Sequence, residues 1–324
     1  LPGSIWMVGG EDVPNMSVKR DKVDWNRDNA GHPPIWVIAA QDYIRQTGDK
    51  TVLKTFYTTL VRQITWFENK RRAEGEGFFY NDILLKKWES GVDQGIRFDE
   101  TAMGPWACID ATSHVYLLYK TAAAWAGELG MEGSFFKRRE GELRRFIRED
   151  LYAADDGMFY DIWAVKDPGL RSQAFEAMWP LVVGAATREQ AERYIDDYLL
   201  NPDVFFTAHP MATVGVKAPK FEQRMWRGPA WNSMTYWAAR ACIDYGRPDA
   251  AVKLLEKALD ATAQQFSETG TIWEFYNSLG GSPLDVQRKP HTEYNVPCRD
   301  YLGHNPLLAM ARLYDSIKKG NRAE

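Results

Sequence analysis

Helical segments that come in pairs constrain this chain more than any other feature of its sequence. Apolar residues recur at intervals of three and four along each segment, which is the period of a helix with a buried face. In each clear pair one segment is apolar nearly all round, and the next carries charges along one side. This alternation predicts an all-α fold, a toroid of helical hairpins with an inner ring wrapped by an outer ring. The segments are 34–48 with 51–75, 104–130 with 134–153, 173–186 with 187–201, 228–246 with 248–270, and 305–320 alone.

We expect residues 1–324 to form one domain. The length exceeds that of an average domain, but closed toroids often reach this size as single units. Residues 1–33 are rich in Gly, Pro, Asn and Asp and show no sustained period, which predicts an irregular N-terminal segment. Long loops with aromatic and acidic residues separate the helix pairs. A functional site is expected where such loops meet at one end of the helix ring.

Charge and cysteine content argue against several kinds of partner. A formal net charge of -4 lacks the positive field that nucleic acid binding requires, and no apolar run reaches the roughly 18 residues of a membrane span. Cys108, Cys242 and Cys298 are odd in number, far apart and in no metal-ligand spacing. We therefore expect free thiols, no metal site and a reducing compartment, which favours the cytoplasm. No P-loop or dinucleotide fingerprint appears, so no cofactor is expected.

The aromatic content is high, with 13 Trp, 15 Tyr and 15 Phe. Most of these rings can be assigned to the core of a large helical protein. Some of them can instead line a sugar site, because pyranose C–H faces stack on aromatic faces while hydroxyl groups bond to nearby polar groups. A small carbohydrate is therefore a candidate partner.

The loop WESGVDQGIRFDE gathers four carboxylates beside aromatic rings. One interpretation is a solvated acidic loop in which Ser90 and Gly91 make a turn. The other is a catalytic loop, because partial desolvation by a neighbouring ring can keep a carboxyl group protonated at neutral pH, as a general acid requires. The four carboxylates are Glu89, Asp93, Asp99 and Glu100.

A second candidate lies in TIWEFYNSLGG, where Glu274 is enclosed by Trp273, Phe275 and Tyr276. This carboxylate fits either a structural ion pair in an ordered loop or a catalytic or ligand-binding role. Glycoside hydrolysis needs two carboxyl groups across the scissile bond, one to protonate the leaving group and one to activate water or attack the sugar. The two loops together supply such a pair.

The first of these loops resembles the ESGxD signature of the trehalase and processing-glucosidase group of (α/α)6 glycosidases. Glu89, Ser90, Gly91 and Asp93 match the signature, and Arg97 falls where the family carries an arginine. Three further blocks follow the family's order: GHPPIWVIAAQDY, RMWRGPAWNSMTYW and IWEFYNSLGG. The resemblance covers most of the chain. It is nearest to the smaller bacterial and archaeal members of glycoside hydrolase family 63, which include hydrolases of mannosylglycerate and glucosylglycerate.

The resemblance implies a catalytic domain that hydrolyses a small α-linked glucoside or mannoside with inversion, as an α-glucosidase or a hydrolase of glycosyl-glycerates, disaccharides or oligosaccharides. Asp93 would protonate the glycosidic oxygen, and Glu274 would take a proton from the attacking water. Arg288 or Lys289 could hold the carboxylate of a glycerate. The substrate-binding residues that we expect are His32, Trp88, Arg97, Trp226, Arg227, Trp273 and Tyr276; an arginine on a carboxylate or a buried Trp can equally be structural.

Two features depart from the family pattern. Such proteins open with further helices and an aromatic Trp-Asp segment, whereas this sequence begins at Leu1 and shows about ten helices, not twelve. We therefore expect a toroid that is incomplete at its N-terminus, completed by missing residues, by a second chain or through a homo-oligomer. In addition, His32 precedes the paired prolines where relatives often have Gln, so the hydroxyl recognised there can differ.

Two other functions fit the same helical pattern. A sugar epimerase or isomerase on an (α/α) barrel would bring His32, His209 or His304 together in the cavity and leave Asp93 outside it. A noncatalytic carbohydrate-binding protein would keep the aromatic platform and bind sugar without turnover. Serine hydrolase and zinc protease functions are disfavoured, because neither a GxSxG nor an HExxH motif occurs.

Overall fold

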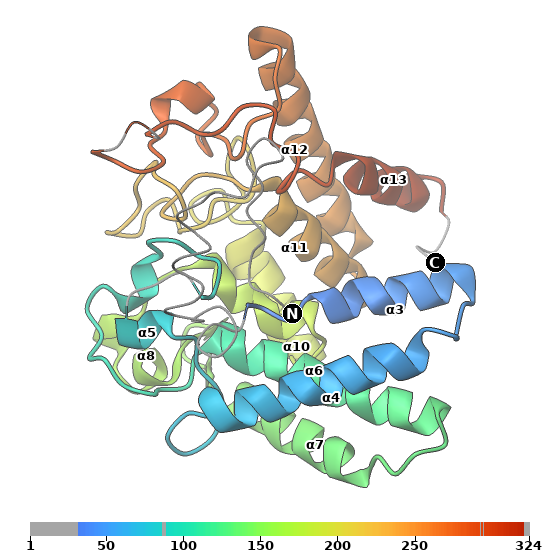
Figure 1. The fold of residues 1–324 in the computed structure, drawn as a ribbon. Helices are drawn as coiled ribbons and strands as arrows, with labels where there is room; N and C mark the ends of the chain where they lie inside the picture. Colours follow the sequence, from blue (N-terminus) through green and yellow to red (C-terminus); the bar gives the residue numbers. More distant parts are fainter. Residues whose placement is uncertain (1–31, 86–88, 292, 294, 321–324) are drawn as a thin grey trace, which may run out of the picture. The chain divides into compact units, whose positions relative to one another are not determined.

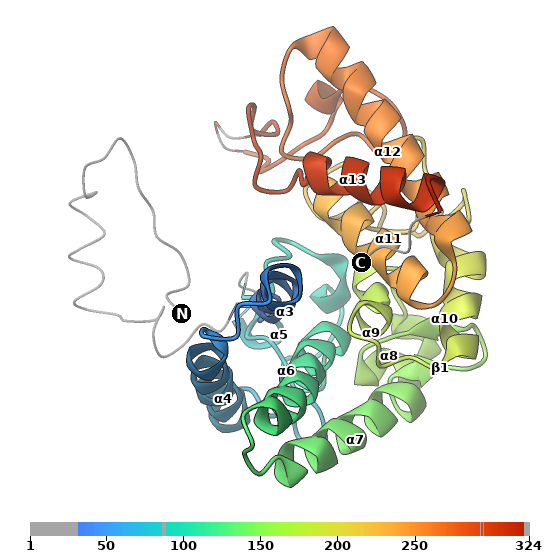
Figure 2. The same cartoon turned by 90° about the vertical axis from the view of Figure 1, so that its right-hand side faces the viewer.

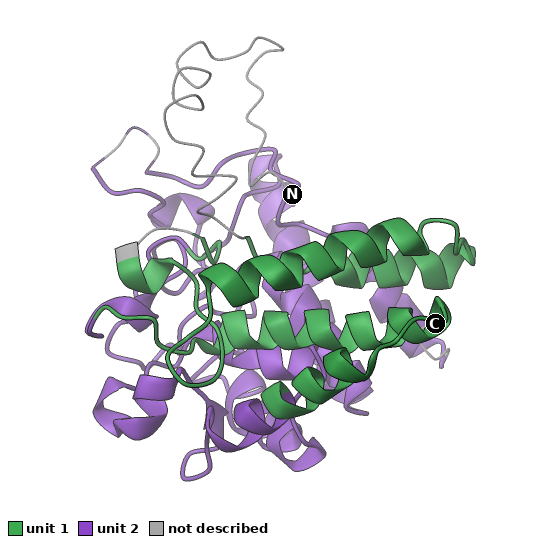
Figure 3. Ribbon diagram, turned by 60° about the horizontal axis from the view of Figure 1, so that its bottom comes forward, with its two compact units in different colours: residues 1–92, 103–143 green, residues 93–102, 144–324 purple. Residues whose placement is uncertain are grey.

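The computed structural model describes residues 32–85, 89–291, 293 and 295–320. Its contacts divide the chain into two compact units, each built from two stretches of sequence (Figure 3). Unit 1 comprises Leu1–Val92 and Met103–Leu143, and unit 2 comprises Asp93–Ala102 and Arg144–Glu324. The expectation of one catalytic domain over residues 1–324 stays a prediction.

Unit 1 is built on α6, a helix that is buried along most of its length. Residues on nearly every side of α6 are buried, whereas α4 buries only one face. Helices α3, α4 and α6 pack against one another (Figure 1). The α3 helix ends at Gly48, whose left-handed φ of 69° is the conformation that favours glycine at a C-cap. The helices are α3 (Trp36–Thr47), α4 (Leu53–Lys70), α5 (Asp82–Leu85), α6 (Ile109–Glu128) and α7 (Ser134–Glu149), which continues into unit 2.

Unit 2 contains short helices, long loops and three longer helices that pack in sequence order, α11 against α12 and α12 against α13 (Figure 2). A single antiparallel strand pair, β1 (Tyr152–Ala153) with β2 (Met158–Phe159), lies among its described residues. The helices are η1 (Ile96–Phe98), α8 (Ile162–Lys166), η2 (Pro168–Leu170), η3 (Phe175–Met178), α9 (Trp179–Val182), α10 (Arg188–Tyr194) with the π turn η4 (Ile195–Leu199), α11 (Asn232–Asp244), α12 (Pro248–Thr269), η5 (Pro283–Asp285) and α13 (Leu307–Lys318).

The all-α prediction is confirmed, with corrections at the level of single elements. The helix predicted over 104–130 begins at Ile109, and the one predicted over 134–153 ends at Glu149, before strand β1. The segment 173–186 is not one helix but the 3-10 turn η3 followed by the single turn α9. Pro180 lacks the N–H of a helix interior, and Gly184 ends the segment with a φ of 71°. The helix predicted over 51–75 is shorter than expected: α4 ends at Lys70. Residues 1–31 of the expected irregular segment lie outside the described residues.

No helix within the described ranges combines the length and the apolar character needed to cross a membrane.

Candidate active site

The predicted general acid, Asp93, begins a short loop of unit 2 that leads into η1. The next residue, Gln94, has a left-handed backbone with a φ of 62°, which costs free energy in a residue other than glycine. Two arginines hold this turn: Arg224 donates from Nη1 to Gln94 Oε1 at 2.8 Å, and Arg227 donates from Nη1 to the Gln94 carbonyl at 3.3 Å. The strained turn is thus fixed directly beside Asp93.

Arg227, one of the predicted sugar-binding residues, forms ion pairs that hold this loop in place. Its Nη2 lies 2.8 Å from Asp99 Oδ2, and its Nε lies 2.9 Å from Glu222 Oε1. Burial lowers the pKa of Arg227, and the hydrogen bond with Asp99 raises it, with a net upward shift. Arg227 therefore ties the Asp93 loop to the loop that precedes α11.

The surroundings of Asp93 raise the pKa of its carboxyl group. Partial burial raises the pKa of Asp93, the cations of Lys289 and Arg288 oppose that shift, and the charge of Glu274 adds to it. None of the hydrogen bonds found among the described residues involves the Asp93 carboxyl group. These four charged groups form one electrostatic cluster within unit 2, in which the charge of Glu274 acts on Asp93.

Glu274, the predicted general base, is buried and held as half of an ion pair. Arg288 donates from Nε to Glu274 Oε2 at 2.5 Å and from Nη2 to Oε1 at 3.0 Å, and the backbone N–H of Cys298 donates to Oε2 at 3.2 Å. A carboxylate has about four acceptor positions. Arg288 and the Cys298 backbone fill three of these positions, and the Cys298 thiol also bonds to the carboxylate.

Trp226, predicted to bind sugar, belongs to a buried stack of rings. Its ring lies parallel to that of Trp231 at a centroid distance of 3.8 Å, and His304 packs edge-on against both. Burial lowers the pKa of His304 overall, although the charge of Glu274 opposes this shift. The stack therefore lies within electrostatic range of the Glu274 carboxylate.

Trp273 and Tyr276 flank Glu274 in its loop and are both almost fully buried. The Tyr276 hydroxyl accepts the backbone N–H of Trp273 at 3.2 Å, and the Trp273 indole donates to Thr269 at 2.9 Å. The His209 ring stacks on Tyr276 at 4.4 Å. Burial lowers the pKa of His209 to about 4, so this histidine is neutral at pH 7 and packs as a ring.

Arg97 lies in unit 2 with Asp93 but points into a buried ion-pair cluster. Its Nη1 lies 2.6 Å from Asp161 Oδ1 and its Nε lies 2.9 Å from Glu176 Oε1, and all three side chains are at most 6% exposed. One guanidinium thus compensates two buried carboxylates, which explains why the position suits arginine without reference to a sugar. Its predicted contact with substrate stays a prediction.

We expect Arg97→Met to lower the free energy of unfolding by about 3–5 kcal/mol, because two buried carboxylates lose their cation. Urea unfolding at pH 7 measures the change. Arg188→Met is the matched control: Arg188 lies 3.8 Å from Glu192 with 65% of its side chain exposed, and its loss should cost at most about 1 kcal/mol. Equal stability of Arg97→Met and the parent would contradict the assignment.

The first residues of the ESGxD motif lie in unit 1 and serve structure. Arg71 donates from Nε and from Nη2 to the Glu89 carboxylate, each at 2.8 Å, and the Asn81 backbone N–H donates to the same group. His32 is near enough to Glu89 for its charge to raise the pKa of the imidazole, although burial lowers that pKa overall. Trp88 lies outside the described residues.

Asp82, which the sequence reasoning missed, anchors the motif through Ser90. Its Oδ2 accepts the Ser90 backbone N–H and its Oδ1 accepts the Ser90 hydroxyl, each at 2.8 Å; Ser90 Oγ in turn accepts the Val92 N–H at 3.1 Å. Burial raises the pKa of Asp82 to about 7 despite these bonds, and the carboxylates of Asp110 and Glu89 add to the shift. Its position before the motif carries no local signal of this contact.

The raised pKa of Asp82 predicts a pH-dependent stability. An unfolded Asp loses its proton near pH 4, whereas the folded group keeps its proton to about pH 7. The folded state therefore binds more protons in this range, and the free energy of unfolding should fall by up to about 4 kcal/mol as pH rises from 4 to 7. Asp82→Asn, which resembles the protonated side chain, should lose this component of the slope. If urea titrations show the same pH dependence of the free energy of unfolding for variant and parent, the raised pKa of Asp82 is refuted.

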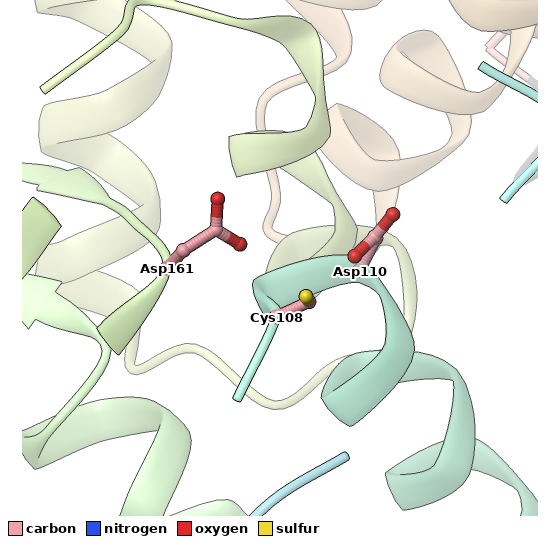
Figure 4. Close-up of side chains that lie close together, drawn as sticks. All are labelled: Cys108, Asp110 and Asp161. Carbon is pink, nitrogen blue, oxygen red and sulfur yellow. The ribbon is translucent and has the colours of Figure 1, made fainter. Parts of the chain in front are cut away.

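Cys108, Cys242 and Cys298 lie within the described residues and are not joined by disulfides. Cys108 and Asp110 lie at the start of α6 (Figure 4), where Asp110 Oδ1 accepts the Ala111 N–H at 2.8 Å. Cys242 is buried in α11 and Cys298 is partly exposed beside Glu274. Burial raises the pKa of both thiols, which disfavours the reactive thiolate at pH 7.

Comparison with solved structures identifies the fold class. The chain is similar to the GH63 mannosylglycerate hydrolase from Thermus thermophilus in complex with Tris and D-glycerate, with a TM-score of 0.66, 14% identity and coverage of 89% of this chain and 77% of that one. An uncharacterized conserved protein from the same organism gives a TM-score of 0.65, 15% identity and coverage of 89% and 78%. The neutral trehalase Nth1 from Saccharomyces cerevisiae gives a TM-score of 0.53 and 17% identity. That match covers 71% of this chain and 42% of the trehalase. The helical fold is that of the (α/α)6 glycosidases.

Comparison of sequences is more specific. Residues 8–295 match the family described as the mannosylglycerate hydrolase MGH1-like glycoside hydrolase domain. No curated protein sequence matches the chain. The chain belongs to the MGH1-like glycoside hydrolase family and is a glycosidase of the glycoside hydrolase family 63 type. This membership favours hydrolysis over the epimerase and binding-protein alternatives.

Proposed function

We propose that this glycosidase hydrolyses a small α-linked glucoside or mannoside with inversion, with Asp93 as general acid and Glu274 as general base. The observation that carries the proposal is the charge cluster of unit 2, in which Asp93 has a raised pKa and Glu274 is paired with Arg288. Inverting hydrolysis needs one protonated and one ionised carboxyl group, and an upward shift of the Asp93 pKa favours Asp93 for the protonated role. The clustered charges support the assignment of the two roles.

In the proposed reaction, Asp93 gives its proton to the glycosidic oxygen while the bond from that oxygen to the anomeric carbon breaks. A water molecule attacks the opposite face of the sugar and passes its proton to the Glu274 carboxylate. Exchange with solvent then reprotonates Asp93 and deprotonates Glu274. The released sugar carries the inverted anomeric configuration.

The charges beside Asp93 favour an anionic leaving group. The leaving group must lie next to the acid, and the cations that act on Asp93 are Lys289 and Arg288. Arg288 bonds to both oxygens of Glu274, and a carboxylate on a leaving group beside Asp93 would lie near both of these cations. Together with the family description, this favours a glycosyl-glycerate as the substrate.

The test is sugar release by the purified chain from glucosyl- and mannosyl-glycerates, the matching glycosyl-glycerols, trehalose and simple α-glycosides. We expect turnover that is fastest on a glycerate, with the first-formed sugar in the inverted configuration by proton NMR. Preference for glycerol over glycerate would refute the anionic leaving group. Retention of configuration would refute the roles of Asp93 and Glu274, and binding without turnover would favour a noncatalytic protein.

A further inference from the structure

The peptide group that precedes Glu274 is held at both of its polar atoms. The Trp273 carbonyl accepts a hydrogen bond from Asn305 Nδ2 at 2.8 Å, and the Glu274 N–H donates to the Cys298 carbonyl at 2.9 Å. Fixing both ends of this peptide fixes its plane. The plane in turn sets the direction in which the Glu274 side chain leaves the backbone.

Asn305 belongs to a chain of buried amides that reaches two helices. Asn232, in the first turn of α11, donates from Nδ2 to Asn305 Oδ1 and to Thr262 Oγ1 of α12, each at 2.9 Å. The Asn232 Oδ1 pairs with His209 Nε2 at 2.9 Å. Because Asn232 Oδ1 can only accept, the neutral His209 carries its proton on Nε2. All four side chains are at most 6% exposed.

A second arm of the network reaches the same loop. Tyr276 accepts the Trp273 N–H, and Thr262 bonds to the Tyr276 hydroxyl. Burial raises the pKa of Tyr276 to about 12, with the bonds from Trp273 and Thr262 opposing the shift, so the hydroxyl stays protonated. The Trp273 carbonyl is linked to Thr262 through Asn305 and Asn232. The Trp273 N–H is linked to the same threonine through Tyr276.

We propose that Asn305, supported by Asn232 and Thr262, is a positioning residue that sets the orientation of the Glu274 carboxylate toward the attacking water. This role rests on the proposed function and deepens it. Buried polar networks that are fully bonded fix a single local arrangement, and a shift of about 1 Å in a catalytic group can cost about 100-fold in rate. Asn305 bonds to the backbone beside Glu274 and not to its carboxylate.

The experiment compares Asn305→Ala with Gln190→Ala. Gln190 also donates its amide to a main-chain carbonyl, that of Arg148 at 2.9 Å, but it lies in α10, where it also forms hydrogen bonds with Thr187. The substrate is the α-glycosyl fluoride of the preferred sugar, assayed with and without sodium azide beside Glu274→Ala. Azide attacks as an anion and needs no base to remove a proton, so it restores turnover where only the base is lost or misplaced.

We expect Asn305→Ala to lower kcat about 100-fold with KM nearly unchanged, and azide to restore much of the rate while forming the glycosyl azide of inverted configuration. Gln190→Ala should keep the parent rate and show no response to azide. Azide rescue of Glu274→Ala without any rescue of Asn305→Ala would overturn the positioning role alone. A parent that hydrolyses no substrate would overturn the proposed function, and this role with it.

Thr262→Val is the second variant, for use if thermal unfolding shows that Asn305→Ala does not fold. It preserves side-chain shape while removing the acceptor of Asn232 and the partner of Tyr276. We expect a smaller loss of kcat that azide also relieves. A loss of activity in Thr262→Val that follows only the folded fraction, with no effect of azide, would overturn the proposal.

Discussion

Asp93→Asn is expected to lower kcat on a natural glycoside by about 10²–10⁴-fold, the usual contribution of a general acid. The amide keeps the shape of the side chain but has no acidic proton for the leaving oxygen. The loss should nearly vanish on an α-glycosyl fluoride, because fluoride departs without protonation. In the parent, kcat/KM should fall as pH rises through the elevated pKa of Asp93, and the variant should lack this basic limb.

The control for Asp93→Asn is Asp203→Asn, another carboxylate of unit 2. Asp203 pairs with Lys217 at 2.6 Å with 58% of its side chain exposed, so its loss should leave kcat unchanged. The measurement is steady-state kinetics on both substrates over a range of pH. If Asp93→Asn is equally impaired on the fluoride and the glycoside, the defect is not one of leaving-group protonation and Asp93 is not the acid.

The helices could be predicted because each carries its own signal. The period of apolar residues marks the buried face, and Gly48 and Gly270 mark ends where the backbone turns left-handed. The same spacing of apolar residues distinguishes α6, which is buried nearly all round, from α4, which is buried on one face. The exception is 173–186, where apolar composition suggested a helix that Pro180 interrupts.

The candidate carboxylates were predictable for a different reason, since Asp93 and Glu274 lie in short motifs whose neighbours are informative. Their partners were not. Arg288 lies 14 residues from Glu274 in sequence, and Asn305 lies 32 residues from the carbonyl of Trp273. Such contacts come from how loops return to one another, and an arginine or asparagine in a loop has no local feature that identifies its partner.

The arginines of the two motifs illustrate the same limit. Arg97 and Arg227 could be recognised as positions that carry an arginine, but the sequence left open whether each contacts sugar or protein. In the structure Arg97 compensates Asp161 and Glu176, and Arg227 pairs with Asp99 and Glu222. These bonds give each arginine a structural task, and a sugar contact would be additional to it.

Glu274→Gln is expected to lower kcat by about 10²–10⁴-fold on both the glycoside and the α-glycosyl fluoride. A fluoride needs no acid, but the attacking water must still lose its proton, so a defect in the base persists on both substrates. This contrast with Asp93→Asn separates the two roles with one pair of assays. The amide also cannot pair with Arg288 through two charged bonds, so part of the stability of the loop should be lost.

Arg288→Lys provides the control for that loss. Lysine keeps the positive charge beside Glu274 but cannot form the two-pronged bond of a guanidinium, so the variant reports the ion pair without removing the base. We expect a fall in thermal stability similar in size to that of Glu274→Gln, with a much smaller effect on kcat. If the two variants lose equal activity on the fluoride and azide restores neither, the loss in Glu274→Gln does not come from a missing base. If only Glu274→Gln loses turnover on the fluoride, its carboxylate is the group that receives the proton of water.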